Sequence, residues 1–170
     1  MSLENIDKIN KLSFPQEDEF MISNVERIRR DYGEDYLGII IIKPQVSLEE
    51  TKYLKELVYE LLNIQELYVL SEKEKRLDTK DVTQIYQRIY QEKPLNSDDM
   101  DYKNNLLDYM ISGESTALLI FGENARISSE EIKLKIRTMF GNDFETKYLR
   151  NFVHVPDKDE FTTTFSVVWR

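Results

Sequence analysis

The chain has 170 residues, of which 41% are hydrophobic and 32% are charged, a composition typical of one globular domain. Its net charge of −9 argues against non-specific binding to nucleic acid or to anionic membranes, because both favour clustered Lys and Arg. The absence of cysteine excludes disulfides, thiol catalysis and cysteine-ligated metals. No apolar run is long enough to cross a membrane and the N-terminus does not resemble a signal peptide, so we expect a cytoplasmic protein.

The first third of the chain contains a polar segment, a strand and a helix. Residues 1–36 are polar apart from a few apolar residues at helical spacing, so we predict an N-terminal appendage with one short helix. Residues 37–42 form a β-branched apolar run ended by a Lys-Pro pair, the pattern of a strand buried on both faces. Ser47 then starts a Ser-x-x-Glu capping box, which predicts a helix over 48–62. We therefore predict one domain over 37–170 that begins with this strand.

The rest of the chain alternates between strand-like and helix-like segments, which are separated by breaker residues. In chain order the patterns predict a strand at 64–70, a helix at 78–91, a loop at 92–104, a short helix at 105–112, a strand at 115–121, a helix at 128–140 opened by a capping box at Ser128, a strand at 147–155, and a segment at 158–169 that fits either type. This order predicts an α+β sandwich of ferredoxin-like type. Its sheet is four-stranded and largely antiparallel, with helices covering one face.

His154 is the only histidine in the chain, and it lies in the strand predicted at 147–155. From the residue alone two interpretations stay open: a half-buried strand residue with a satisfied hydrogen bond, or a reactive group. The five glycines of the chain do not form a G-x-x-x-x-G-K pattern, which excludes a P-loop kinase.

Three stretches, in this order, resemble motifs of the nucleoside diphosphate kinases. The segment IIIIKP is similar to that family's first strand with its Lys-Pro, and YMISGESTALLIF resembles its Tyr-Met-x-Ser-Gly followed by an apolar strand. The segment IRTMFG, followed by LRNFVHVPD, is similar to the family's Ile-Arg segment and its Arg-Asn-x-x-His motif. The resemblance spans residues 37–169, and the family's ferredoxin-like fold agrees with the predicted order of elements.

The resemblance implies a phosphotransferase that moves a γ-phosphate from a nucleoside triphosphate to a nucleoside diphosphate through a phosphohistidine. It also implies Mg²⁺ as the cofactor, carried by the nucleotide phosphates rather than by a protein metal site. The site residues that it implies are His154 as the nucleophile, Lys43, Arg137 and Arg126 at the phosphates, Asn151 at the sugar hydroxyl, and Tyr86 beside the histidine.

The sequence departs from the family at positions that matter for phosphoryl transfer. A Val-Pro pair replaces the Gly-Ser that follows the histidine, and Phe165 stands where the family has a glutamate that orients the imidazole. The carboxylates that could substitute are Asp157, Asp159 and Glu160. The alternative function is therefore a nucleotide-binding or regulatory module that has lost transfer, and a third is an interaction domain that shares only the fold.

Family members assemble as hexamers or tetramers that are built from one dimer. The segment between 122 and 151 is shorter than its counterpart in the family, which includes a loop used in trimer contacts. The resemblance therefore implies a homo-oligomer, and we favour a dimer.

Overall fold

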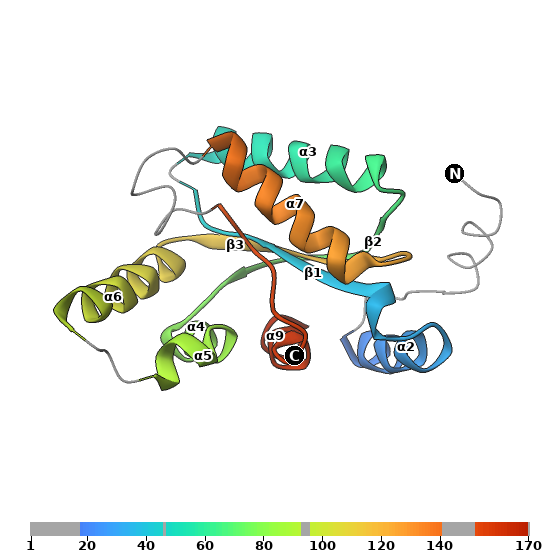
Figure 1. The fold of residues 1–170 in the computed structure, drawn as a ribbon, viewed down its shortest axis with the longest axis horizontal. Coiled ribbons are helices and arrows are strands. Elements are labelled where there is room, and N and C mark those ends of the chain that lie inside the picture. The colour runs from blue at the N-terminus through green and yellow to red at the C-terminus, as the bar shows by residue number, and fades with distance from the viewer. Residues whose placement is uncertain (1–17, 46, 93–95, 141–151, 170) are drawn as a thin grey trace.

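The computed structural model describes residues 18–45, 47–92, 96–140 and 152–169, and within them it contains one four-stranded sheet (Figure 1). The strands lie in the order β2-β3-β1-β4, and every neighbouring pair is antiparallel. A helical connection leads from β1 to β2 past β3, and another leads from β3 to β4 past β1, as in the ferredoxin-like fold. The predicted fold class is confirmed. The strands are β1 (Leu37–Ile42), β2 (Tyr68–Arg76), β3 (Glu114–Phe121) and β4 (Val153–His154).

Helices cover both faces of the sheet rather than one (Figure 1). The helices α3 and α7 lie on one face, and α2, α4, α6 and α9 lie on the other. The prediction of a single covered face is wrong because β1 and β3 are buried on both sides, and both sides have to be removed from water. The helices are α2 (Asp18–Asp31), α3 (Leu48–Ile64), α4 (Thr79–Ile85), α5 (Gln87–Gln91), α6 (Ser97–Ile111), α7 (Ala125–Phe140) and α9 (Phe161–Trp169), with a short 3-10 helix, η1 (Glu34–Tyr36), before β1.

Alternate residues of the central strand contribute to two separate hydrophobic clusters. Odd-numbered residues of β1 face α2, α4, α6 and α9, whereas its even-numbered isoleucines face α3 and α7. Gly38 allows α7 to approach β1 closely, because a Cβ at this position would lie 2.4 Å from Oγ of Ser129. This contact holds α7 against the strand that ends at Lys43.

The helix expected within residues 1–36 is present as α2, and it shares the core of the sheet. Met21, Val25 and Ile28 are buried in the same cluster as β1 and α9. The boundary between residues 36 and 37 stays a prediction.

Two predicted starts of helices are wrong. The part of the predicted loop at 92–104 that follows Asn96 is helical, because the Asn96 side chain caps α6 by accepting a hydrogen bond from the backbone N–H of Asp99 (2.9 Å). The helix α7 begins at Ala125, so Ser128 lies inside it and does not cap it.

Other boundaries shift by a few residues. The helix predicted at 78–91 is interrupted at Tyr86, where the backbone (φ −105°, ψ 36°) separates α4 from α5. The second strand begins at Tyr68 rather than residue 64, because α3 continues to Ile64. The undecided C-terminal segment forms α9, and only the end of the predicted fourth strand lies within the described residues, as β4. Within the described ranges no helix is both long enough and apolar enough to span a lipid bilayer.

Candidate functional site

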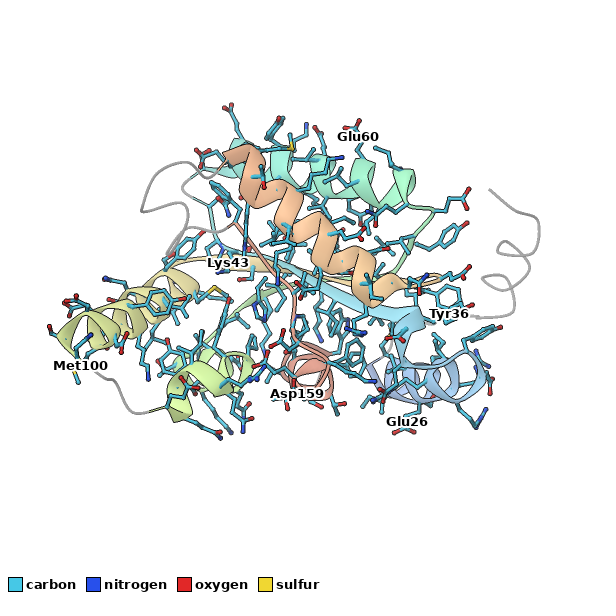
Figure 2. The ribbon with its side chains drawn as sticks, in the orientation of Figure 1. Glu26, Tyr36, Lys43, Glu60, Met100 and Asp159 are labelled. Carbon is cyan, nitrogen blue, oxygen red and sulfur yellow. The ribbon has the colours of Figure 1, made fainter. Side chains whose placement is uncertain are left out.

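The register of the strands places His154 and Lys43 on the same face of the sheet. Ile41 of β1 pairs with His154 of β4, so their side chains point to the same side. Lys43 follows Ile41 by two residues and faces that side as well. Figure 2 shows Lys43 and Tyr36 at opposite ends of β1, with Lys43 at the end nearer to α6. Both candidate residues therefore face the layer that contains α4 and α6.

The imidazole of His154 is almost completely buried, with 9% of the residue exposed. Its ring lies 4.5 Å from the ring of Tyr86, measured between centroids, and its Nε2 is buried without a hydrogen-bond partner in the described part of the chain. Burial holds the pKa of the imidazole well below its ordinary value of 6.5, and the charges of Lys43, Lys133 and Arg137 lower it further. The imidazole is therefore neutral at pH 7, the form in which a ring nitrogen acts as a nucleophile.

The side chain of Lys43 is more deeply buried, and the residue is only 2% exposed. Its backbone N–H donates to the carbonyl of Phe152 (2.8 Å), which holds the end of β1 beside the chain that leads into β4. Nζ lies 5.5 Å from the ring centroid of Tyr86 and 5.9 Å from that of Tyr109, within the range of cation–π attraction. Burial, followed by the charge of Arg137, lowers the pKa of the amine to about 7. At neutral pH this amine is thus divided between its charged and neutral forms.

Two further cations, Lys133 and Arg137, come from α7 and share one face of that helix because they are four residues apart. Nη2 of Arg137 donates to the carbonyl of Val153 (3.4 Å), and its Nε is buried without a partner among the described residues. Burial lowers the pKa of this guanidinium. Lys133 forms an ion pair with Glu130, and its side chain is 13% exposed. Arg137 was predicted and Lys133 was missed, although its spacing to Arg137 in the helix predicted at 128–140 could have revealed it.

Tyr86, between α4 and α5, and tyrosines of α6 border these cations. The hydroxyl of Tyr86 donates to Sδ of Met110 (3.8 Å), which fixes the ring that contacts both the lysine and the histidine. Burial raises the pKa of Tyr86 well above its ordinary value, and the neighbouring Tyr102 and Tyr109 contribute to the shift. Tyr102 escaped prediction because the loop expected at 92–104 hid the helix that it shares with Tyr109.

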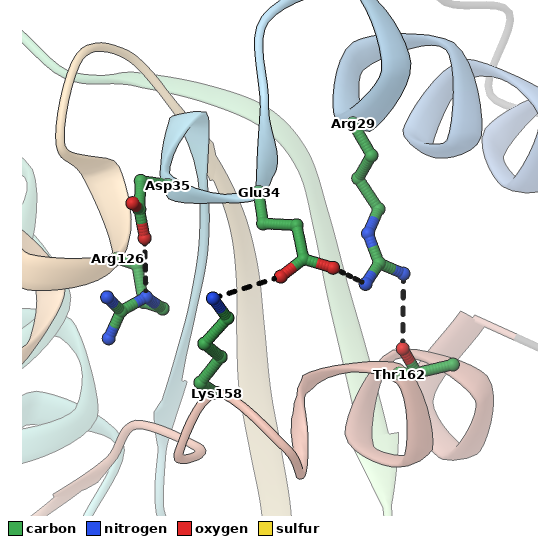
Figure 3. A network of polar contacts seen from close by, with 6 residues as sticks. All are labelled: Arg29, Glu34, Asp35, Arg126, Lys158 and Thr162. Carbon is green, nitrogen blue, oxygen red and sulfur yellow. Dashed lines mark hydrogen bonds and ion pairs between the residues drawn. The ribbon is translucent and has the colours of Figure 1, made fainter.

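Arg126 lies outside this group, and its role as a phosphate-binding residue stays a prediction that this placement does not support. It forms an ion pair with Asp35 at 2.9 Å, before the start of β1 (Figure 3). Arg126 and Arg137 are eleven residues apart on α7, which corresponds to about 16 Å at 1.5 Å per residue. Asn151 lies outside the described residues, and its role stays a prediction.

The charges around Arg126 form a salt-bridge network at that end of β1 (Figure 3). Arg29 bonds to Glu34 at 2.6 Å, and Lys158 bonds to the second oxygen of Glu34 at 3.4 Å. Arg29 also donates to the hydroxyl of Thr162 on α9 (3.2 Å). We call Arg29, Glu34, Asp35, Arg126 and Lys158 the salt-bridge network.

No carboxylate replaces the missing partner of the imidazole within the described part of the chain. Phe165 is buried in the core, 5.3 Å from Trp169 between ring centroids. Asp157 forms an ion pair with Arg88 (2.6 Å), and Glu160 accepts a hydrogen bond from the backbone N–H of Asp157 (3.3 Å). Neither carboxylate bonds to the histidine ring, and Asp159 is exposed. No carboxylate among the described residues therefore fixes the tautomer of the imidazole.

We call Lys43, Lys133, Arg137 and His154 the basic cluster. In addition to burial, the charges of Arg137 and Lys133 lower the pKa of Lys43, and all three cations lower the pKa of the imidazole, which means that protonation of Lys43 and of His154 is resisted. An anion placed among them would relieve this repulsion, and a phosphate chain offers several oxygens to several cations at once. The geometry therefore suits a phosphorylated ligand, in a chain whose overall charge is −9. Within the described ranges no three His, Cys, Asp or Glu side chains gather as a metal site.

Scanning the sequence against protein-family models gave no match, and neither did a search of curated proteins. A search of solved structures found nucleoside diphosphate kinases. The NDP kinase of Pyrobaculum aerophilum is 18% identical to this chain and has a TM-score of 0.58, over 79% of this chain and 96% of its own. The enzyme of Aquifex aeolicus is 20% identical with a TM-score of 0.55, over 77% of this chain and 92% of its own. That of Encephalitozoon cuniculi is 16% identical with a TM-score of 0.59, over 78% of this chain and 87% of its own.

These identities are low, so the likeness concerns the fold. It covers most of this chain and nearly all of each kinase. The resemblance that the three sequence motifs indicated is thus confirmed at the level of structure: the chain has the α+β fold of the nucleoside diphosphate kinases.

Proposed function

We propose that the basic cluster binds the phosphates of a nucleoside triphosphate and that His154 accepts the γ-phosphoryl group before passing it to a nucleoside diphosphate. The observation that carries this proposal is the convergence of the neutral imidazole of β4 with three cations, one directly after β1 and two from α7. The same convergence is what the motifs of the sequence required, and the fold is that of kinases with this activity.

In the proposed reaction a ring nitrogen of His154 attacks the γ-phosphorus. A P–N bond forms while the bond to the oxygen that bridges the β- and γ-phosphates breaks, and the nucleoside diphosphate leaves with the electron pair. A terminal β-phosphate oxygen of a second nucleoside diphosphate then attacks the phosphohistidine and restores the imidazole. Lys43 and Arg137 stabilise the charge on the γ-phosphate oxygens in both steps.

The remaining predicted contacts complete this proposal. Mg²⁺ bound to the nucleotide phosphates would supply further charge neutralisation at the cluster, whose own side chains are cations and tyrosines. Asn151 contacts the sugar hydroxyl, and Tyr86 holds the imidazole through the contact between the two rings. We further propose that the protein is cytoplasmic and acts as a homodimer.

A second function is favoured by one specific observation. The position of the orienting glutamate is filled by Phe165 in the core, and no carboxylate bonds to His154 among the described residues. Transfer leaves a proton on the second ring nitrogen, and a carboxylate is the usual group that stabilises it. The alternative is therefore a regulatory module that binds nucleotides at the same cluster without forming a phosphohistidine.

The two functions are separated by incubation with γ-labelled ATP and Mg²⁺, beside a His154→Ala variant that is checked for folding by circular dichroism. The kinase requires acid-labile label on the wild-type chain, none on the variant, and release of the label when a nucleoside diphosphate is added. The regulatory module requires no label on either chain, together with an increase in Tm when ATP is present. A chain that neither labels nor gains stability contradicts both functions.

A further inference from the structure

The polar face of α7 contains a carboxylate directly between its cations. Arg126, Glu130, Lys133 and Arg137 follow one another at spacings of four, three and four residues, which places them in one row along the helix. Glu130 bonds to Lys133, and the side chains are 30% and 13% exposed. One member of the basic cluster is thus already held by an anion of the chain itself.

The bonding of Glu130 is incomplete. One carboxylate oxygen bonds to Lys133, while Oε1 is buried and has no hydrogen-bond partner among the described residues. A carboxylate with one unsatisfied oxygen is poorly stabilised in its place. Because the side chain still reaches solvent, it can turn outward and recover hydration when Lys133 is taken by another anion.

We propose that Glu130 competes with the ligand's phosphates for Lys133. It holds Lys133 in the empty site and releases it when a phosphate chain binds. This inference rests on the proposed function, because it assumes that the basic cluster is the phosphate site. Lys133 is then a phosphate-contacting residue in addition to Lys43 and Arg137, and Glu130 sets the affinity by determining how much of the time Lys133 is available.

The electrostatic surroundings agree with a role for Lys133 at the site. The charge of Lys133 acts on both His154 and Lys43, and on His154 it has a larger effect than that of Arg137. Glu130 in turn acts on Arg137. The pair therefore lies within electrostatic reach of the whole cluster, and a change in it alters the charge that an incoming phosphate meets.

The same helix provides matched controls. Glu131 and Lys135 are exposed neighbours of the pair, and Glu131 bonds only weakly to Gln65 (3.5 Å). The variants Glu131→Gln and Lys135→Met change the net charge as much as Glu130→Gln and Lys133→Met, without touching the pair. Each variant keeps the approximate size of the side chain at a position that is not fully buried, so all of them are expected to fold.

The test is calorimetric titration of the full chain with inorganic tripolyphosphate and with ATP, in the wild type and in these variants. We expect Glu130→Gln to tighten binding about fivefold and Lys133→Met to weaken it about tenfold, with Lys133→Arg within about twofold of the wild type. In the Lys133→Met background, Glu130→Gln should have no more effect than Glu131→Gln, because no lysine remains to be released.

Three results would overturn the inference while leaving the proposed function intact. In the first, Glu130→Gln matches Glu131→Gln in a chain that binds ATP. In the second, Lys133→Met matches Lys135→Met. In the third, Glu130→Gln tightens binding equally with and without Lys133, which would show that it acts by its charge alone. Absence of binding in the wild type and in Glu130→Gln would overturn both the inference and the proposed function. Binding in Glu130→Gln alone would support both.

Discussion

The two ends of α7 carry similar charges in different surroundings. In the salt-bridge network at the Arg126 end, the three cations pair with carboxylates, and Glu34 alone accepts from two of them (Figure 3). The side chains of this network are between 28% and 62% exposed. In the basic cluster at the Arg137 end, Lys43 is 2% exposed, and burial followed by the charges of Arg137 and Lys133 lowers the pKa of its amine.

This difference separates charges that hold the fold from charges that weaken it. Exposed ion pairs cost little to form and link the segments before β1 and after β4 to α7 and α2. A buried lysine with a lowered pKa costs stability, so a sequence that retains one has another use for it. The end of α7 whose charges are energetically unfavourable in the empty protein is thus the end that we propose to bind phosphates.

The largest effect on ATP binding should come from replacing, one at a time, the arginines near the two ends of α7. Arg137→Met is expected to weaken ATP binding about a hundredfold, because it removes a donor that can bond two phosphate oxygens. Arg126→Met should leave the affinity within about twofold of the wild type, since its partner is Asp35. Calorimetry on both variants measures this. An equal loss in the two variants would mean that the comparison between the ends is wrong.

Removing the buried amine should stabilise the protein while it destroys the site. We expect Lys43→Met to raise the free energy of unfolding by about 1–3 kcal/mol at pH 7, because an apolar side chain of similar length replaces a buried charge. The same variant should lose binding of ATP. Urea unfolding with and without ATP measures both quantities. A destabilised variant would show that the amine supports the fold instead.

The pH dependence of the stability gained by Lys43→Met follows from the lowered pKa of the Lys43 amine. Below pH 7 the amine is protonated in both the folded and unfolded chains, so its burial is most costly there. Between about 7 and 10.5 only the unfolded chain keeps the proton, and the wild type gains stability as the pH rises. The advantage of Lys43→Met should therefore be largest at pH 6–7 and shrink towards pH 10.

For the candidate site, the sequence was most informative about Lys43 and His154, which lie at the end of one predicted strand and within another. The family motifs singled out Lys43 and His154 in distant segments, and the register of β1 and β4 then places both on one face of the sheet. Arg137 followed from the same family motifs. Arg126 lies outside the three motifs, and the structure places it eleven residues before Arg137 on α7, beside Asp35.

The residues that were missed depend on tertiary packing. Lys133 was not considered in the sequence analysis, and it is the packing of the folded chain that brings its charge within reach of Lys43 and His154. Tyr102 was assigned to a loop, because the acidic run after Asn96 hid the start of α6. The second layer of helices was also missed, although the sequence indicated it. The pattern of β1 predicts a strand buried on both faces, and such a strand needs helices on both sides of the sheet.

The smallest effect should come from the carboxylate that joins two cations of the salt-bridge network. A hydrogen bond from Arg29, and then one from Lys158, hold the pKa of Glu34 below its ordinary value of 4.5. The stabilisation is therefore present above pH 4.5 and lost as the pH falls through the lowered value. Because Glu34 is 46% exposed, screening by solvent limits the cost of Glu34→Gln to about 0.5 kcal/mol or less.

Salt distinguishes this small effect from the larger one at the other end of α7. In 1 M NaCl the cost of Glu34→Gln should fall towards zero, because ions screen charges that solvent reaches. The stability gained by Lys43→Met should persist in the same salt, because burial rather than a screened attraction is its main cause. If the stability changes of Glu34→Gln and of Lys43→Met both vanished in salt, the charges at the two ends would be screened alike. The buried lysine would then no longer indicate a site.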